Sequence, residues 1–361
     1  MSEIVFILGA GASREAGAPL VSDFIEKARA LRRAGRVRQF EAEFDCVLDA
    51  ISKLQAVHSK SELALDNIES VFAAFEMGAL IDKLPGVSGD EKQRRLLAAF
   101  RRVITVTLEE SVTFPTHGQV AVADKAYKKF GMLVKTLNGD GSQGRCSIIT
   151  FNYDVALDYA LWAVGVSVDY CLRGTRQTES TPLLKLHGSL NWARCSKCHG
   201  IIAWNVDDYI KQYRPITWER DGRIPLYMAS ELPHSSLTCC NGGIIPDPVI
   251  VPPTWDKTRY HEALSPVWRR AALELESAES VFVSGYSLTE SDSFFRYLFS
   301  LGTVGDTIIE RFWVFDPDEQ GLVRKRFERL IGPAVRARFR FENKTFAEAC
   351  GVVERALRSK D

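Results

Sequence analysis

The sequence lacks an excess of charge of either sign. Its 46 lysine and arginine residues balance 46 aspartate and glutamate residues, so the formal net charge at pH 7 is +0. A balanced charge gives no general attraction to nucleic acid, to anionic lipid or to a cationic partner. We therefore expect no membrane binding and no direct nucleic-acid binding, because either would need a local patch of one sign.

Long hydrophobic runs are also absent. No stretch approaches the ~20 apolar residues that a membrane-spanning helix needs. At the start of the chain, acidic Glu3 precedes a short apolar run, whereas a signal peptide has a basic start and a longer apolar region. These absences predict a cytoplasmic protein. In that compartment the eight cysteines are expected to be free thiols or metal ligands rather than disulfides.

Four short apolar runs are typical of strands buried on both faces of a parallel sheet. They are residues 3–8, 146–151, 280–287 and 311–317. Helical patterns separate these runs, so the sequence predicts an α/β fold with a Rossmann-like parallel sheet and flanking helices. Because such sheets bind ligands beyond the carboxyl ends of their strands, we expect the functional residues there.

The pattern divides the chain into three parts. Residues 1–30 and 145–361 are predicted to form the α/β domain, residues 31–144 a helical insertion, and residues 193–245 a small cysteine-bearing insert that could be a zinc ribbon. Helical periodicity extends from about Ser22 to Leu137. Its apolar faces are Phe44, Val47, Leu48, Ile51 and Leu54, then Ile68, Val71, Phe72 and Phe75. The glycine-rich stretch at 138–144 is predicted to be a loop.

A last helix is predicted from Thr345, because Glu348 lies three residues later in a capping-box arrangement. The helix would present an apolar stripe to the flank of the domain. The stripe consists of Phe346, Cys350, Val353 and Leu357.

The stretch FILGAGASREAGAP, residues 6–19, follows the first predicted strand. Its glycines Gly9, Gly11 and Gly17 permit close backbone approach, and the helix that follows would direct its amino end at a phosphate. The third glycine comes too late for the GxGxxG pattern of redox enzymes. That pattern also needs a second strand that ends in an acidic residue ~20 positions further on, whereas a helical stretch follows here. The turn therefore suits a pyrophosphate but not hydride chemistry. Alternatively, it is a tight turn that binds nothing.

Two further motifs, TFNYD at 150–154 and KLHGSLNW at 185–192, follow apolar runs. GAGAS and the Gly17–Pro19 segment precede these motifs, and a cysteine-bearing insert follows them. This order of motifs resembles the sirtuin superfamily. The resemblance covers residues 1 to about 30 and about 145 to 320. The resemblance implies that NAD binds to Gly9, Ala10, Gly11, Ser13, Pro19, Gly285, Ser287 and Asp316. It also implies that Asn152 and Asp154 lie near the nicotinamide ribose and that His187 is the catalytic base. An alternative for Asp316 is that it caps a turn.

These residue types suit cleavage of the bond between ribose and nicotinamide, which builds oxocarbenium character at the anomeric carbon. The Asn152 amide can donate and accept, so it could fix a water or a ribose hydroxyl in line for attack. His187 could take a proton, and Asp154 could orient these groups or stabilise the growing charge. The alternative is that Asn152 and Asp154 cap the next helix and that His187 is a core histidine.

The cysteines of CSKC, Cys195 and Cys198, have the spacing of a zinc knuckle. Cys239 and Cys240 could complete a structural zinc site. Sirtuins generally have a second CxxC here, whereas position 237 is leucine, so His199 and His234 remain further candidate ligands. The alternative is a hairpin of buried thiols without metal.

The resemblance leaves three functions open. Sirtuin deacylases carry a substrate-docking FGE after the second cysteine pair, whereas residues 242–257 read GGIIPDPVIVPPTWDK, in which Pro252 and Pro253 lack backbone donors. With the helical insertion and DNIESVF at 66–72, the chain more closely resembles the sirtuin-like NAD hydrolases of bacterial anti-phage defence. This implies NAD as a substrate that is split to nicotinamide and ADP-ribose, with activity gated by homo-oligomerisation or by a partner such as a HerA-type ATPase or another defence protein. The alternatives are an NAD-dependent protein deacylase and a non-catalytic NAD or ADP-ribose sensor.

Overall fold

The structure is a computed structural model of the chain. It describes residues 2–55, 62–118, 120–139, 146–174, 177, 179–204, 206–213, 222–229, 239–240, 243–245, 247–251, 258–289 and 292–358. Most of the predicted loop at 138–144, His234, and the pair Pro252 and Pro253 lie outside the described residues.

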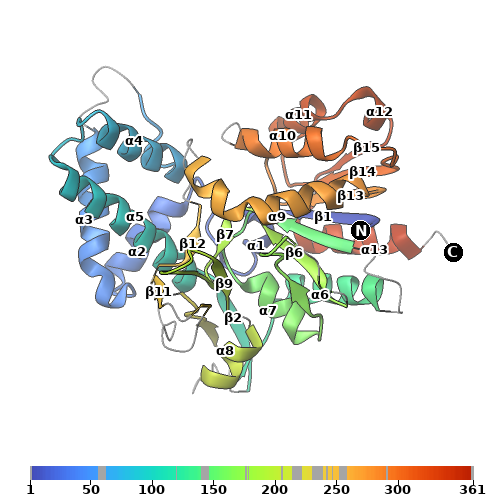
Figure 1. The fold of residues 1–361 in the computed structure, drawn as a ribbon, viewed down its shortest axis with the longest axis horizontal. Coiled ribbons are helices and arrows are strands. Elements are labelled where there is room, and N and C mark those ends of the chain that lie inside the picture. The colour runs from blue at the N-terminus through green and yellow to red at the C-terminus, as the bar shows by residue number, and fades with distance from the viewer. Residues whose placement is uncertain are drawn as a thin grey trace.

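A seven-stranded parallel sheet forms the α/β part of the molecule (Figure 1), with the strand order β15-β14-β13-β1-β4-β6-β5. Its strands are β1 (Ile4–Leu8), β4 (Cys146–Thr150), β5 (Val168–Asp169), β6 (Thr181–Lys185), β13 (Ser280–Ser284), β14 (Arg311–Phe315) and β15 (Phe339–Glu342). Every residue of β1, β4, β6 and β13 is buried, which explains why these segments are mostly apolar. The predicted fold class, a parallel sheet with flanking helices, is confirmed.

The four predicted strands correspond to β1, β4, β13 and β14, with ends within a few residues of those expected. The remaining three strands of the sheet carry weaker signals. β5 is two residues long, and β15 alternates aromatic with charged side chains because it lies at the edge of the sheet. β6 is the apolar run that precedes His187.

Helices cover the sheet. They are α1 (Ala10–Ser13), α6 (Lys125–Asn138), α7 (Ala156–Ala163), α9 (Thr258–Glu276), α10 (Ser293–Gly302), α11 (Leu322–Leu330), α12 (Pro333–Arg336) and α13 (Phe346–Arg358). The capping box that begins α13 is confirmed, because the Glu348 carboxylate accepts hydrogen bonds from the Thr345 N–H and hydroxyl. The predicted stripe of α13 is buried except for half-buried Leu357, and the helix packs on α6 and β13.

The predicted helical insertion, residues 31–144, begins within α2 (Phe24–Arg33) and includes a 3₁₀ turn η1 (Arg38–Phe40), α3 (Glu41–Leu54), α4 (Ile68–Leu80) and α5 (Asp90–Ser111). In Figure 1 these helices form a group beside the sheet, and α5 packs against α2, α3 and α4. Their predicted apolar faces are buried, except that Leu48 is only partly so.

The expectation of helix as far as Leu137 is wrong between α5 and α6. Here β2 (Thr113–His117) and β3 (Val120–Ala121) pair in a three-stranded sheet with β10 (Arg223–Pro225). Pro115 explains the break, because proline disrupts a helix interior, and its threonine neighbours favour strands. Within the described residues, no helix is long and apolar enough to cross a bilayer.

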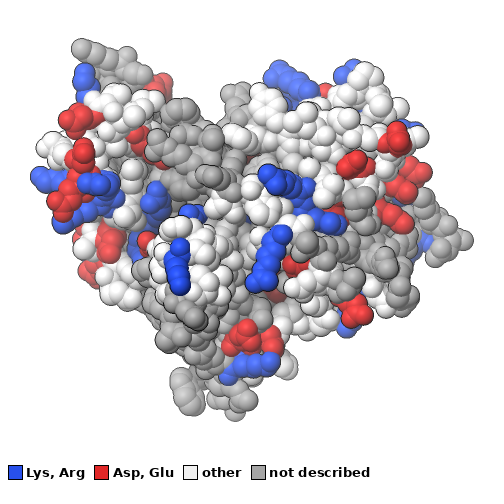
Figure 2. Space-filling model, in the orientation of Figure 1, with Lys and Arg blue, Asp and Glu red and all other residues white. Residues whose placement is uncertain are grey.

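Short elements lie within and on either side of the predicted cysteine-bearing insert, residues 193–245. They are β7 (Gly188–Ser189), β8 (Trp192–Cys195), β9 (Ile201–Ala203), α8 (Val206–Tyr213), β11 (Ile244–Ile245) and β12 (Val249–Ile250). β11, β8 and β9 form one small sheet, and β12 pairs with β7. Figure 2 shows acidic and basic side chains interspersed over one face of the molecule.

Candidate active site at the carboxyl end of the sheet

A cavity of about 740 Å³ lies at the carboxyl end of the parallel sheet. The segments that follow β1, β4, β6, β13 and β14 all contribute to its wall. The cavity lies beside β1, where the strand order reverses, with β4 and β6 to one side and β13 and β14 to the other. Sheets of this kind bind ligands at such a reversal, and the volume falls within the range of about 300–1,000 Å³ for small-molecule pockets.

Most of the residues that the sequence singles out line this one cavity. They are Ala10, Gly11, Pro19, Asn152, Asp154, His187, Gly285, Ser287 and Asp316. The other two candidates for the NAD site, Gly9 and Ser13, are buried next to it.

The glycines after β1 and β13 approach one another closely. A Cβ on Gly9 would lie 2.5 Å from the Gly285 carbonyl oxygen, and Gly285 itself has a φ of +63°. The N–H groups of Gly9 and Gly11 donate to the carbonyl oxygens of Ser284 and Gly285, at 3.2 and 2.9 Å. These two N–H groups therefore hold two turns together rather than point at a phosphate, and the helix that follows them, α1, is a single turn.

Ser13 joins the two motif residues of the TFNYD loop. Its hydroxyl donates to Asp154 Oδ2 at 2.8 Å, accepts from Asn152 Nδ2 at 3.0 Å, and lies 2.7 Å from the hydroxyl of Tyr127 on α6. Because the Ser13 proton goes to the carboxylate, Tyr127 donates the third bond. Ser13 is fully buried and is not part of the cavity lining, so it orients Asn152 and Asp154 from the protein interior.

The side chain of Asn152 has a fixed orientation. Its Nδ2 donates to the Gly9 carbonyl oxygen at 2.9 Å as well as to Ser13, which occupies both amide protons. The atom that Asn152 can offer to the cavity is therefore Oδ1, an acceptor. The sequence allows this amide to donate and accept, whereas the structure leaves it the accepting role.

Asp154 has two roles. Its Oδ1 accepts a hydrogen bond from the Ala156 N–H at the start of α7, although Val155 and not Asp154 is the N-cap residue of that helix, and the residue also lines the cavity. Burial raises the pKa of the Asp154 carboxyl, and the positive charge of Lys185 partly opposes this shift. With both carboxylate oxygens bonded to the protein, Asp154 is suited to holding the loop in place.

His187 follows β6 and is half-buried at the cavity wall. Its ring and that of Phe151 meet edge to face, with 5.1 Å between centroids, and Phe151 in turn stacks on Tyr286 at 4.3 Å. The His187 carbonyl oxygen accepts from the Val251 N–H at 2.7 Å, which fixes the backbone at the start of β7. His187 therefore forms part of the cavity wall.

Asp316 directly follows β14, which lies on the other side of β1 from β4 and β6. Burial raises the pKa of its carboxyl to about 6, and the negative charge of Asp318 adds to this effect. Two basic residues, Arg14 and Lys344, also line the cavity.

Sequence reasoning missed the contribution of the helical insertion. Asn67, Ile68 and Glu69 at the start of α4 line the cavity, as do Ile104 and Leu108 of α5. Asn67 caps α4, because its Oδ1 accepts from the Glu69 and Ser70 N–H groups. The motif DNIESVF contains this capping residue, but nothing in its sequence indicates which element it faces.

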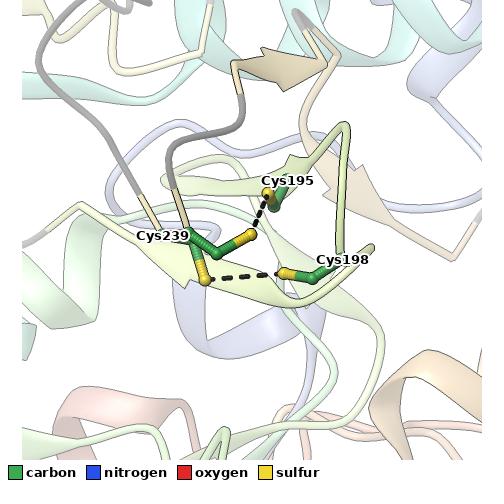
Figure 3. A group of neighbouring side chains, drawn as sticks. Cys195, Cys198 and Cys239 are labelled. Atoms are coloured by element: carbon green, nitrogen blue, oxygen red, sulfur yellow. Dashed lines mark hydrogen bonds between the residues drawn. The ribbon is translucent and has the colours of Figure 1, made fainter.

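The four cysteines of the insert meet at one point (Figure 3). Their sulfurs all lie within 4.8 Å of one another, with 3.6 Å between Cys195 and Cys240 and 3.6 Å between Cys198 and Cys239. Two sulfurs bound to one tetrahedral zinc at ~2.3 Å would be about 3.8 Å apart, so the cluster fits that ion. His199 is exposed and is not part of the cluster.

Comparison with known proteins assigns no family. No family model matches the chain, and no curated protein matches it. Among solved structures it is similar to "Sir2-p53 peptide-NAD+", with 14% identity over 99% of this chain and 93% of that chain and a TM-score of 0.40. It is also similar to "Crystal structure of a Sir2 homolog-NAD complex", with 16% identity, 99% and 90% coverage and a TM-score of 0.38. At these scores the similarity identifies no residue role in this chain.

Proposed function

We propose that the protein binds NAD in the cavity and hydrolyses the bond between nicotinamide and ribose, giving nicotinamide and ADP-ribose. The observation that carries this proposal is that Asn152, after β4, and His187, after β6, line one cavity of suitable size. Asn152 offers only an acceptor oxygen there, and an acceptor holds a water by one of its protons.

In this proposal Asn152 Oδ1 positions a water against the anomeric carbon of the nicotinamide ribose. The water oxygen forms a bond to that carbon, the carbon–nitrogen bond breaks, and its electron pair leaves with the nicotinamide ring. His187 takes the proton that the water loses. Ser13 and Asp154 keep the Asn152 side chain in the required orientation.

The rest of the cavity suits the other half of NAD. Asp316 and Ser287 would face the adenosine ribose, where a carboxylate can accept from hydroxyl groups. Arg14 and Lys344 would balance the negative charge of the pyrophosphate, since the Gly9 and Gly11 N–H groups are bonded to the protein.

Hydrolysis is favoured over protein deacylation because α4 and α5 of the insertion line the same cavity. An acyl-lysine side chain needs an open path to the ribose, and these helices take up part of the cavity wall through which such a path would run. A non-catalytic sensor would need the cavity but not the imidazole of His187.

Product analysis by chromatography separates these three functions. Purified wild type and Asn152→Ala are incubated with NAD alone and with NAD plus an acetylated peptide. Nicotinamide and ADP-ribose formed without peptide, and lost in the variant, support the hydrolase. O-acetyl-ADP-ribose formed only with peptide would make the protein a deacylase, and NAD binding without turnover would favour a sensor.

We propose further that the cysteine cluster holds a structural zinc ion. Cys195, Cys198, Cys239 and Cys240 supply four ligands, which leaves no open position for a substrate. The ion would join β8 to the segment before β11. Elemental analysis near one zinc per chain supports this site, and a metal-free protein as purified contradicts it.

An unregulated NAD hydrolase would deplete its own cell. We therefore propose that a cytoplasmic role in anti-phage defence requires gating, by homo-oligomerisation or by a partner such as a HerA-type ATPase. Light scattering combined with the turnover assay tests this, because turnover per chain should rise with the assembled fraction. Equal turnover in monomer and oligomer, and with or without the partner, would contradict gating.

A further inference from the structure

A buried ion pair lies behind the candidate active site. Lys185 at the end of β6 and Asp158 on α7 are 1% and 2% exposed, and the Lys185 ammonium is 3.0 Å from Asp158 Oδ2. Its second contact is the Asp154 main-chain carbonyl oxygen, at 2.7 Å. One ammonium therefore connects the strand that leads to His187 with the loop that carries Asn152.

The ion pair continues into a chain of buried side chains. Asp158 Oδ1 accepts from the Tyr170 hydroxyl at 2.5 Å, and that hydroxyl accepts from Asn191 Nδ2 at 2.9 Å. Asn191 Oδ1 accepts from the Ser189 hydroxyl at 2.6 Å. Asn191 and Ser189 are completely buried, and both come from the segment that begins at His187.

A main-chain bond closes the chain into a ring. The Leu190 N–H donates to the Tyr153 carbonyl oxygen at 2.9 Å, one residue before Asp154. The ring thus begins and ends on the TFNYD loop and passes twice through the segment around His187. Through Asp158 and Tyr170, the ring joins the loop that carries Asn152 to the segment that begins at His187.

Stability alone gives little reason for such a ring. A buried ion pair is often no better for stability than apolar side chains of the same volume, because removing both charges from water is costly. A ring that fixes two reactive segments relative to each other has a different use, since misplacement of about 1 Å can lower a rate by about 100-fold.

We propose that Lys185, Asp158, Tyr170 and Asn191 are positioning residues that hold Asn152 and His187 at a fixed separation. This rests on the proposed NAD hydrolysis for its kinetic consequence, whereas its structural consequence does not depend on any activity. None of the four residues lines the cavity.

The first test compares two tyrosine variants. Tyr170→Phe removes the ring hydroxyl, whereas Tyr159→Phe removes a buried hydroxyl on α7 that bonds to the Ala121 carbonyl oxygen outside the ring. With NAD as substrate, Tyr170→Phe should lower kcat about 10–100-fold and leave KM within about twofold, because binding contacts remain. Tyr159→Phe should leave both constants near those of wild type.

Hydrogen exchange supplies a readout that needs no turnover. In Tyr170→Phe, main-chain amides of residues 152–156 and 187–191 should exchange faster together, by about tenfold. In Tyr159→Phe these two segments should keep wild-type rates. Exchange that changes only near residue 170, or coupled exchange with an unchanged kcat, would overturn the positioning role.

A double variant separates positioning from stability. Lys185→Met combined with Asp158→Leu replaces the ion pair by apolar side chains, so Tm should fall less than in either single variant, which would leave one buried charge unpaired. The kcat should nevertheless fall as in Tyr170→Phe. Recovery of both Tm and kcat would show that the pair is only structural. If the wild type itself does not cleave NAD, the proposed function fails, and the exchange experiment alone decides about the ring.

Discussion

The wall of the cavity and the cysteine cluster both bring together side chains that are far apart in the chain, but different interactions hold them. In the cavity wall, Ser13 and Asn152 bond directly to each other although 139 positions separate them. In the cluster, sulfurs from two segments stand 3.6 Å apart, and hydrogen bonding to neighbouring thiols raises the pKa of Cys240 to about 12. Hydrogen bonds between different kinds of side chain organise the first region, whereas the second is a group of four like ligands whose spacing fits a tetrahedral metal ion.

The comparison predicts that the two regions can be damaged separately. His187→Ala removes the proposed base and should lower NAD turnover about 10²–10⁴-fold, the usual contribution of a general base. NAD affinity and zinc content should change little. The matched control is His199→Ala, because His199 is exposed beside the cluster and outside the cavity lining. Turnover that survives His187→Ala would refute the catalytic assignment.

Removing a sulfur ligand should act on stability first. Cys240→Ser should abolish stoichiometric zinc and lower the free energy of unfolding by about 4 kcal/mol or more, as expected for loss of a structural metal. Cys46→Ser, which changes an exposed thiol on α3, should leave both quantities unchanged. Elemental analysis and chemical denaturation measure these effects. Equal zinc content in the two variants would exclude the cluster as a metal site.

The contact between the two glycine turns gives a smaller effect. In Gly285→Ala the new Cβ would lie 2.3 Å from the Ala12 main-chain nitrogen at a φ of +63°, so the free energy of unfolding should fall by at least about 1–3 kcal/mol. Gly321→Ala is the control, because Gly321 has a similar φ of +70° but no atom within 4 Å of its Cβ position. Its loss should be about 1 kcal/mol, the cost of placing a side chain in the left-handed region. Equal losses in denaturant titrations would mean that backbone strain, and not the close approach, accounts for Gly285.

The smallest expected effect concerns Asp316. Its pKa of about 6 exceeds the ordinary value of 3.8, so between pH 4 and 6 the folded protein binds more protons than the unfolded chain. Stability contributed by this group is therefore present at low pH and is lost as pH rises towards 6. This fall should be shallower in Asp316→Asn.

Ionisation of Asp316 should strengthen NAD binding, although it lowers the stability of the free protein. The ionised carboxylate accepts from ribose hydroxyls, so NAD affinity measured by calorimetry should rise by up to about tenfold between pH 5 and 7. Asp316→Asn should remove this rise. A rise of the same size in the variant would place the titrating group elsewhere.

Much of the sheet is predictable from local sequence. EIVFIL and CSIITF are apolar enough to be buried on both faces, and glycine follows the first, so both strands and the turn are visible. The polar residues after the strands could be assigned to one edge by the rule for parallel sheets. The edge strand β15 and the short β5 are less visible, because pairing rather than composition defines them.

The details of the site depend on distant contacts. Nothing in GAGAS shows that Ser13 points inward to Asn152, or that Gly9 meets Gly285 instead of a phosphate. The role of Lys185 is equally hidden, because one lysine at a strand end resembles any surface lysine until its partners are known. Likewise, the adjacency of Cys239 and Cys240 could not decide between sulfur and imidazole ligands.

The most direct test of the account is a crystal structure of the His187→Ala variant grown with NAD. The account predicts intact NAD in the cavity, with the nicotinamide ribose beside Asn152 Oδ1 and the adenosine ribose beside Asp316. NAD bound elsewhere, an empty cavity at saturating NAD, or a ligand whose nicotinamide ribose lies beside Asp316 would contradict it.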